Sequence, residues 1–197
     1  LILFKYPERG IKMACNIEIC VKEESSTTEK GHLLEELVAN ILEIQQFEVV
    51  KTIRVTGMEI DILARHKVNH AQILVECKAW ESNLPADVIS KLLGNVELRN
   101  VSAGWLISTG PLSKDAEGIR TEWEKRTDSV RSKLSFYTPD RILDLLLASR
   151  IIKPIEIIKD RVNKEFNTSE NQTLIITDIG KYRSEERRVG KECRSRW

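Results

Sequence analysis

Residues 47–78 read FEVVKTIRVTGMEIDILARHKVNHAQILVECK, and this stretch decides the fold. It contains three segments rich in aliphatic and β-branched residues, which are Phe47 to Val55, Met58 to Arg65 and Ala71 to Lys78. Gly57 separates the first two segments, and the polar stretch HKVNH separates the last two, as turns separate neighbouring strands. The stretch therefore predicts a meander of three antiparallel strands.

The segments on either side show helical and strand patterns in turn. Before the meander, apolar residues recur at helical spacing and predict an amphipathic helix over about Lys30 to Gln45. After it, the predicted elements are a helix from Pro85 to Asn100, a buried strand from Ala103 to Thr109, a helix from the cap residue Ser113 to Arg126, a strand from Leu134 to Thr138 and a helix from Pro139 to Ser149. The core order αβββαβ predicts an α/β fold with a mixed central sheet flanked by helices.

The composition limits the classes of function. The chain has 197 residues, of which 41% are hydrophobic, so it can form one main domain with a proper core. Its formal net charge of +1 gives no general attraction to nucleic acid, so any DNA contact must come from a local patch. The apolar runs are far shorter than the roughly 20 residues of a membrane span. The four cysteines form no CxxC pair. We therefore expect a cytoplasmic protein with reduced thiols and no membrane partner.

Strand alternation brings three charged residues together in the meander. Asp61 lies on the face opposite Ile60 and Ile62, and Glu76 and Lys78 share one face of the next strand. If the two strands pair, both carboxylates and the ammonium group meet at one place. Two carboxylates bind a hard cation such as Mg²⁺, and a lysine orients the attacking water or helps to deprotonate it. The pattern predicts metal-assisted phosphodiester hydrolysis, and the competing interpretation is a salt-bridged patch on a solvated face.

The first helix offers a third carboxylate. Glu35 falls at the edge of the apolar stripe beside Leu42, whereas Glu36 lies on the polar side of the helix. Glu35 is therefore the better candidate for a residue that holds the metal through water or fixes a second ion. The hydrophobic strands around the polar residues and the order of the elements favour a catalytic site over a salt-bridged patch.

Four separated blocks resemble the Mrr-type restriction endonucleases of the PD-(D/E)xK superfamily. The blocks are KGHLLEELV at 30–38, GMEIDILA at 57–64, VECK at 75–78, and GWLISTG with a following SKDA at 104–116. The resemblance covers residues 28–150 and implies a restriction-endonuclease-like core. It implies that the catalytic residues are Glu35, Asp61, Glu76 and Lys78. It also implies that the backbone carbonyl of Cys77 joins Asp61 and Glu76 as a metal ligand, and that the cofactor is Mg²⁺, with Mn²⁺ as a substitute.

The resemblance further implies a substrate and partners. We expect cleavage of double-stranded DNA by a homodimer or larger oligomer, as the nuclease part of a restriction or antiphage defence protein. Met58 and Glu59 stand where many relatives have a Gly-rich lead to the aspartate, and Glu76 replaces a frequent Gln, which restores the commoner superfamily pattern. Two alternatives stay open. One is a structure-selective nuclease similar to Holliday-junction resolvases, and the other is a catalytically silent DNA-binding module.

Candidate DNA contacts lie outside the three strands. Trp80 follows the third strand directly and can stack on a base, with packing at the rim of the core as the alternative. Six basic residues form a local positive stretch that contacts phosphates or else belongs to solvated surface: Lys114, Arg120, Lys125, Arg126, Arg131 and Lys133.

The two ends predict separate segments. We expect residues 1–27 to be an N-terminal extension and linker, partly non-native, because the chain begins with Leu1 and Met13 is the first plausible initiator. Residues 183–197, RSEERRVGKECRSRW, resemble a translated sequencing adapter, and without them the net charge becomes slightly negative. Residues 151–182 then form a connector in which Thr173 to Thr177 predicts a strand. We expect the native protein to continue into a fused C-terminal region.

Overall fold

The computed structural model describes residues 14–21, 27–55, 58–152, 171–178 and 180–185. Its main sheet has five strands in the order β2-β3-β4-β5-β6. β2 (Phe47–Val55), β3 (Met58–His66) and β4 (Gln72–Lys78) are antiparallel neighbours, and β5 (Ala103–Ser108) and β6 (Leu134–Tyr137) extend the sheet in parallel with β4. The predicted meander is confirmed, and its first strand has the predicted bounds.

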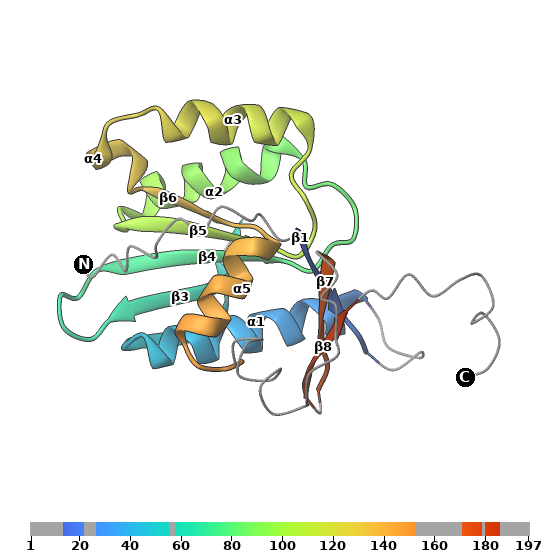
Figure 1. The fold of residues 1–197 in the computed structure, drawn as a ribbon. Helices are drawn as coiled ribbons and strands as arrows, with labels where there is room; N and C mark the ends of the chain where they lie inside the picture. The colour runs from blue at the N-terminus through green and yellow to red at the C-terminus, as the bar shows by residue number, and fades with distance from the viewer. Residues whose placement is uncertain (1–13, 22–26, 56–57, 153–170, 179, 186–197) are drawn as a thin grey trace, which may run out of the picture.

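Helices cover both faces of this sheet (Figure 1). α1 (Thr27–Ile44) and α5 (Pro139–Ala148) lie on one face, and α2 (Ala86–Arg99) and α3 (Lys114–Glu124) lie on the other. A short helix, α4 (Asp128–Arg131), follows α3 and was not predicted. The predicted α/β fold with a mixed central sheet flanked by helices is confirmed.

Local sequence explains where the helices begin. Ser113 caps α3, because its Oγ accepts a hydrogen bond from the backbone N–H of Ala116 at 3.2 Å, as the sequence predicts. Pro139 occupies the first turn of α5, where its missing N–H costs no hydrogen bond. α1 begins at Thr27 rather than near Lys30. Among the described residues, no helix is both long and apolar enough to cross a membrane.

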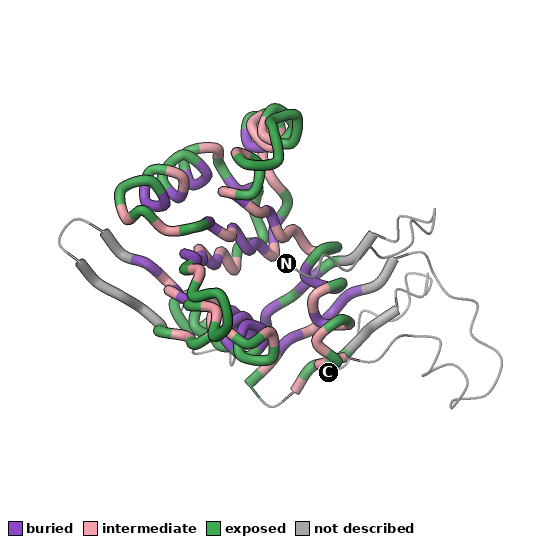
Figure 2. The backbone as a smooth tube through the Cα atoms, turned by 90° about the vertical axis from the view of Figure 1, so that its left-hand side faces the viewer, coloured by how far each residue is buried: buried purple, intermediate pink, exposed green. Residues whose placement is uncertain are grey.

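The core has two halves, separated by the main sheet. The half on the α1 and α5 side includes Ile62, Val75 and Cys77, whereas the half on the α2 side includes Leu74 and Leu106. Figure 2 shows buried residues along the central strands and along the sides of the helices that face them. The residues of β4 thus alternate between the two halves, which fixes the face from which Glu76 and Lys78 project.

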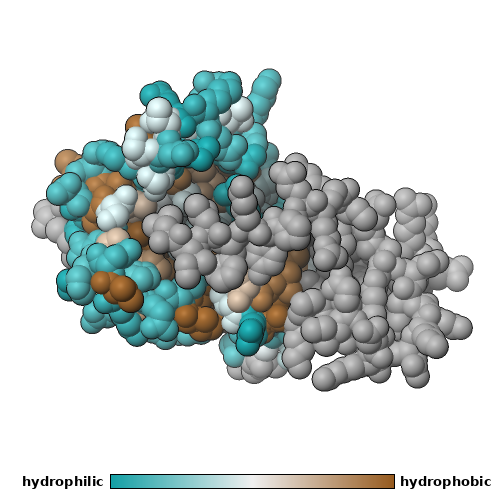
Figure 3. Space-filling view, turned by 60° about the vertical axis from the view of Figure 1, so that its left-hand side comes forward, coloured by the Kyte–Doolittle hydropathy of each residue, from teal (hydrophilic) through white to brown (hydrophobic). Residues whose placement is uncertain are grey.

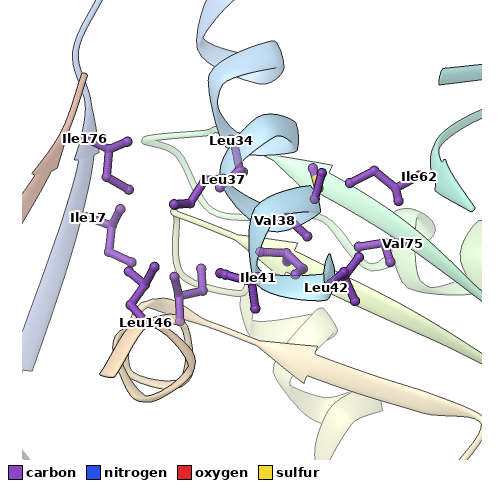
Figure 4. Packing of buried hydrophobic residues seen from close by; sticks show 14 of the residues in the cluster. Ile17, Leu34, Leu37, Val38, Ile41, Leu42, Ile62, Val75, Leu146 and Ile176 are labelled. Carbon is purple, nitrogen blue, oxygen red and sulfur yellow. The ribbon is translucent and has the colours of Figure 1, made fainter. Parts of the chain in front are cut away.

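A second sheet pairs segments from the beginning and the end of the described residues. It has the order β1-β7-β8, with β1 (Ala14–Ile19) parallel to β7 (Asn171–Ile176) and β8 (Lys181–Glu185) antiparallel to β7. Figure 4 shows Ile17 and Ile176 of this sheet beside Leu146 of α5 and Leu37 of α1. The second sheet therefore completes the half of the core that contains α1.

This second sheet differs from the predicted organisation of the ends. β7 confirms the predicted strand near Thr173, but β1 lies within the expected extension 1–27 and was not predicted. β8 includes residues 183–185, the first three of the segment that resembles an adapter. Residues 1–13 and 186–197 lie outside the described residues.

Candidate active site

The site begins at a fork between β3 and β4. Their backbone pairing runs from Arg65 opposite Gln72 to Ile62 opposite Val75. Asp61 is the next residue along β3, and its Oδ2 accepts a hydrogen bond from the backbone N–H of Cys77 at 2.7 Å. The carboxylate thus takes the position that a backbone carbonyl holds in a regular ladder. Because a side chain stands between the strands, they separate there.

The fork also changes the alternation of β3. The sequence predicts that Ile60 and Ile62 share a face, but Ile62 packs in the α1 half of the core and Ile60 packs in the α2 half. The expectation assumes a regular strand that is paired on both sides. In the structure, β3 is paired with β4 only from Ile62 onward. Beyond the fork β3 keeps its pairing with β2 alone, and Ile60 packs in the α2 half of the core.

The fold brings Asp61, Glu76 and Lys78 together. Lys78 Nζ lies 2.6 Å from Glu76 Oε1 and 3.9 Å from Asp61 Oδ2. The three side chains are largely shielded from water, with exposed fractions of 22% for Lys78, 14% for Glu76 and 16% for Asp61. Glu76 and Lys78 are two residues apart in β4, so strand alternation alone puts them side by side.

Burial gives this cluster unusual proton affinities. It raises the pKa of Asp61 from 3.8 to about 6, and the negative charge of Glu76 adds to the rise. The N–H of Cys77 and the ammonium of Lys78 oppose this rise, while Glu35 reinforces it. Burial lowers the pKa of Lys78, but the hydrogen bond and charge of Glu76 outweigh that effect, and the pKa of Lys78 is raised. Lys78 is therefore protonated at neutral pH.

Glu35 comes to the site from α1. Its side chain is only 14% exposed, and its Oε2 lies 3.5 Å from Nδ1 of His32, one turn earlier in the helix. Its charge raises the pKa of both Asp61 and Cys77, as expected for a carboxylate close to the fork. Glu36, its neighbour, is exposed. The choice of Glu35 over Glu36 from helical phase is thus consistent with the packing of α1.

Cys77 has a structural place beside the site. Its side chain is buried in the α1 half of the core. Burial, and next the charge of Asp61, raise the pKa of the thiol well above its usual value, so it stays neutral. In a strand, the N–H and C=O of one residue point to the same side. Because the N–H of Cys77 points toward Asp61, its carbonyl is directed into the same fork.

The donor groups at the fork suit a hard divalent cation. Asp61 and Glu76 are two shielded carboxylates whose mutual repulsion contributes to the raised pKa of Asp61, and a cation between them would relieve it. Within the described residues, no group of three or more His, Cys, Asp or Glu side chains is close enough to hold a metal ion alone. A cation here would therefore also need the Cys77 carbonyl and water, as the predicted ligand set includes.

The six basic residues predicted to contact DNA lie on α3 and α4 or directly after them. Most of the six basic residues pair with a carboxylate. Arg120 pairs with Glu117, Lys125 with Glu122 at 2.6 Å, Arg131 with Asp128 at 2.6 Å and Lys133 with Glu97 at 2.7 Å. Lys114 and Arg126 border a shallow depression on α3. Figure 3 shows a mainly hydrophilic surface at the top of the molecule, where Figure 1 draws α3. In each of these four ion pairs a carboxylate lies next to the basic group and offsets its positive charge.

Trp80 and two residues of α1 form the rim of the site. Trp80 is 39% exposed, two residues beyond Lys78. Sequence reasoning did not assign Lys30 or His32 to the site. Lys30 Nζ bonds to Oε1 of Glu81 at 2.9 Å and so ties α1 to the segment that carries Trp80. The spacing of three residues between His32 and Glu35 is a signal from which their contact could have been predicted.

One family model and two solved structures are similar to this chain. A model of the family described as Mrr_cat, restriction endonuclease, matches residues 27–128, which include Glu35, Asp61, Glu76 and Lys78. A protein of unknown function, AF1548, is 22% identical with a TM-score of 0.47, over 68% of this chain and 72% of that one. The DNA modification-dependent restriction endonuclease AspBHI is 13% identical with a TM-score of 0.44, over 68% of this chain and 39% of that one. The comparison with curated protein sequences gives no match.

Proposed function

The chain belongs to the restriction endonuclease family Mrr_cat, and from this premise we propose that it is a metal-dependent endonuclease that hydrolyses phosphodiester bonds of double-stranded DNA. The observation that carries the proposal is the fork, where Asp61 and Glu76 lie beside Lys78 in a shielded position. We propose Mg²⁺ as the cofactor, with Mn²⁺ as a substitute, because carboxylate, carbonyl and water oxygens suit both ions.

Each residue of the fork has a distinct task in this mechanism. Asp61 and Glu76 bind the cation, the carbonyl of Cys77 adds a neutral oxygen, and Glu35 holds a water at the edge of the cluster. When bound, the cation supplies stabilisation of the charge that develops on the phosphate and acidification of the attacking water. The side chain of Lys78 would form hydrogen bonds to the attacking water or to a phosphate oxygen and orient them.

A double-strand break in one binding event requires more than one copy of the site. One fork cuts one strand at a time, so the two strands need one fork each. We therefore propose a homodimer or larger oligomer that acts on DNA in the cytoplasm. We also propose that this chain is the nuclease part of a restriction or antiphage defence protein with a further C-terminal region. Trp80, at the rim, is the candidate for stacking on a base.

Nicking of supercoiled plasmid tests the proposed activity. The wild-type protein is expected to nick and linearise plasmid with Mg²⁺ or Mn²⁺ and to do neither with EDTA. Asp61→Ala and Lys78→Ala should each abolish cleavage while the circular dichroism spectrum stays that of the wild type. Lys91→Ala, an exposed lysine of α2, is the matched control and should cut normally. If the wild type cuts no plasmid with either ion, or if both site variants cut normally, the proposal is wrong.

Substrate competition separates the remaining alternatives. Equal amounts of a linear duplex and a four-way junction, each with a different label, are offered to the wild type. Preferential cleavage of the duplex is expected for a restriction-type nuclease, and preferential cleavage of the junction would indicate a structure-selective one. Retention of both DNAs without cleavage, with and without metal, would indicate a DNA-binding module.

A further inference from the structure

The segment that follows Lys78 is held by the residue that follows β5. Thr109 donates two hydrogen bonds to this segment. Its backbone N–H donates to the carbonyl of Lys78 at 3.0 Å, and its Oγ1 donates to the carbonyl of Trp80 at 3.0 Å. The hydroxyl also lies 3.4 Å from the carbonyl of Lys78. One residue thus fixes the chain at Lys78 and again two residues later.

The turn after β5 packs tightly against the segment that follows Lys78. Gly110 packs directly against the segment, since a Cβ there would lie 2.6 Å from the carbonyl oxygen of Ser82 and 2.7 Å from that of Trp80. The buried Oγ of Ser108 donates to the carbonyl of Gly110 at 2.9 Å and holds this turn in shape. A glycine is therefore required at position 110, because any side chain would push the two segments apart.

Lys78 depends on this attachment because of its position in the sheet. It is the last residue of β4, where it pairs with Ser108 of β5. On the other side, β4 has separated from β3 before this point, because their pairing ends at Val75. Backbone support for Lys78 therefore comes from the β5 side. The hydroxyl of Thr109 extends this support to the carbonyl of Trp80, two residues beyond the last strand pair.

We propose that Thr109 is a positioning residue for Lys78. Thr109 acts through the carbonyls of Lys78 and Trp80 and does not touch the substrate. This proposal rests on the proposed nuclease function for its effect on catalysis. The hydroxyl keeps the segment after β4 in one conformation, so that the ammonium of Lys78 stays within reach of both Glu76 and the attacking water. Small displacements of a group that orients a reactant lower the rate strongly.

Two substitutions at position 109 test the role of the hydroxyl. Thr109→Val has nearly the same shape and keeps the N–H but removes the Oγ1 donor, and Thr109→Ser keeps both donors. Thr121→Val is the matched control, because Thr121 Oγ1 also donates to a backbone carbonyl, that of Glu117, but in α3. Cleavage of plasmid with Mg²⁺ is measured as kcat and KM, together with the melting temperature of each variant.

The expected result separates positioning from folding. Thr109→Val should lower kcat about tenfold and change KM less than about twofold, whereas Thr109→Ser and Thr121→Val stay near the wild type. A wild-type kcat in Thr109→Val would overturn the proposal. A loss in Thr109→Ser equal to that in Thr109→Val would also overturn it, because the hydroxyl would then not be the group that matters.

Hydrogen exchange makes the test independent of activity. Amide exchange of peptides that cover residues 78–84 should become faster in Thr109→Val, with unchanged exchange in β2 and α2. Unchanged exchange in 78–84 would contradict the attachment even if the rate falls. If the wild type cuts no DNA, the proposed function fails, and the exchange measurement still decides whether Thr109 fixes the segment after Lys78.

Discussion

Two charged regions of this molecule look alike in sequence and differ in structure. At the fork, Lys78 and Glu76 lie 2.6 Å apart with exposed fractions of 22% and 14%. At the surface, Glu97 of α2 and Lys133, which follows α4, lie 2.7 Å apart with exposed fractions of 56% and 42%. The first pair lies beside Asp61, whose pKa is raised to about 6. In the second pair the two opposite charges cancel while both side chains stay in contact with water.

This difference separates charged groups that the fold stabilises from charged groups whose ionised form the fold destabilises. An exposed ion pair adds little free energy and needs no function to explain it. A cluster of carboxylates shielded from water costs free energy that the rest of the fold must offset. Asp61 is such a group, because burial and the charge of Glu76 both oppose its ionised form. The fork is therefore the region where a cation has most to stabilise.

The largest contrast is expected between the two glutamates of these pairs. Glu76→Ala removes a proposed metal ligand and should lower kcat/KM at least ~10³-fold, equivalent to roughly 4 kcal/mol of transition-state stabilisation. Glu97→Ala breaks an ion pair of nearly equal length and should change kcat/KM less than about twofold. Initial rates of plasmid nicking measure both. Similar losses in the two variants would contradict the distinction between the regions.

A smaller contrast is expected between adjacent residues of α1. Glu35→Ala should lower the rate about 10- to 100-fold, the usual range for a group that supports metal ligands through water. Glu36→Ala changes an exposed side chain and should leave the rate unchanged. The nicking rate at saturating Mn²⁺ is the measurement. A loss in Glu36→Ala that exceeds the loss in Glu35→Ala would show that the helical phase is assigned wrongly.

Replacement of Asp61 should stabilise the metal-free fold, although it should abolish cleavage. Between pH 3.8 and about 6 the folded protein binds more protons at Asp61 than the unfolded chain, so the stability from this group falls as pH rises through that range. With EDTA at pH 8, Asp61→Asn should raise the free energy of unfolding by about 1 to 3 kcal/mol, and the gain should vanish near pH 4.

The control for this effect is an exposed aspartate at the start of α4. Asp128 pairs with Arg131 and its side chain is 91% exposed. Asp128→Asn should change the free energy of unfolding by less than about 0.5 kcal/mol at either pH. Urea denaturation measures both variants. Destabilisation by Asp61→Asn at pH 8 would mean that the carboxylate is stabilised, rather than strained, at the fork.

The smallest effects are expected in the basic stretch. Lys125 pairs with Glu122 on the surface of α3, with both side chains well exposed. Lys125→Ala should change the KM for plasmid less than about twofold at physiological salt. A several-fold rise in KM that grows as the salt is lowered would instead identify the α3 region as a phosphate contact.

The sequence predicts most of the fold because its signals are local. Helical and strand periodicities within residues 30–150 give the elements of the main sheet, and alternation in β4 places Glu76 beside Lys78. β1 was missed because it is a short segment whose partner, β7, comes from the other end of the chain. Pairing between segments so far apart leaves no local pattern.

Details of the site depend on contacts that periodicity does not contain. The bond from the Cys77 N–H to Asp61 and the turn of Ile60 toward α2 follow from the separation of β3 and β4. The ion pairs of α3 and α4 join residues three apart, so helical spacing contains a signal for them. The pair between Lys133 and Glu97 gives no such signal, because tertiary folding brings it together.

Calorimetric titration of Mn²⁺ into the metal-free protein at pH 7.5 tests the central claim, that the carboxylates of the fork hold the cation and Lys78 does not. The account predicts binding by the wild type, at least tenfold weaker binding by Asp61→Asn, and binding by Lys78→Met at least as tight as by the wild type, because the ammonium no longer competes for Glu76. Absence of binding by the wild type, or equal affinity in the wild type and Asp61→Asn, would contradict it.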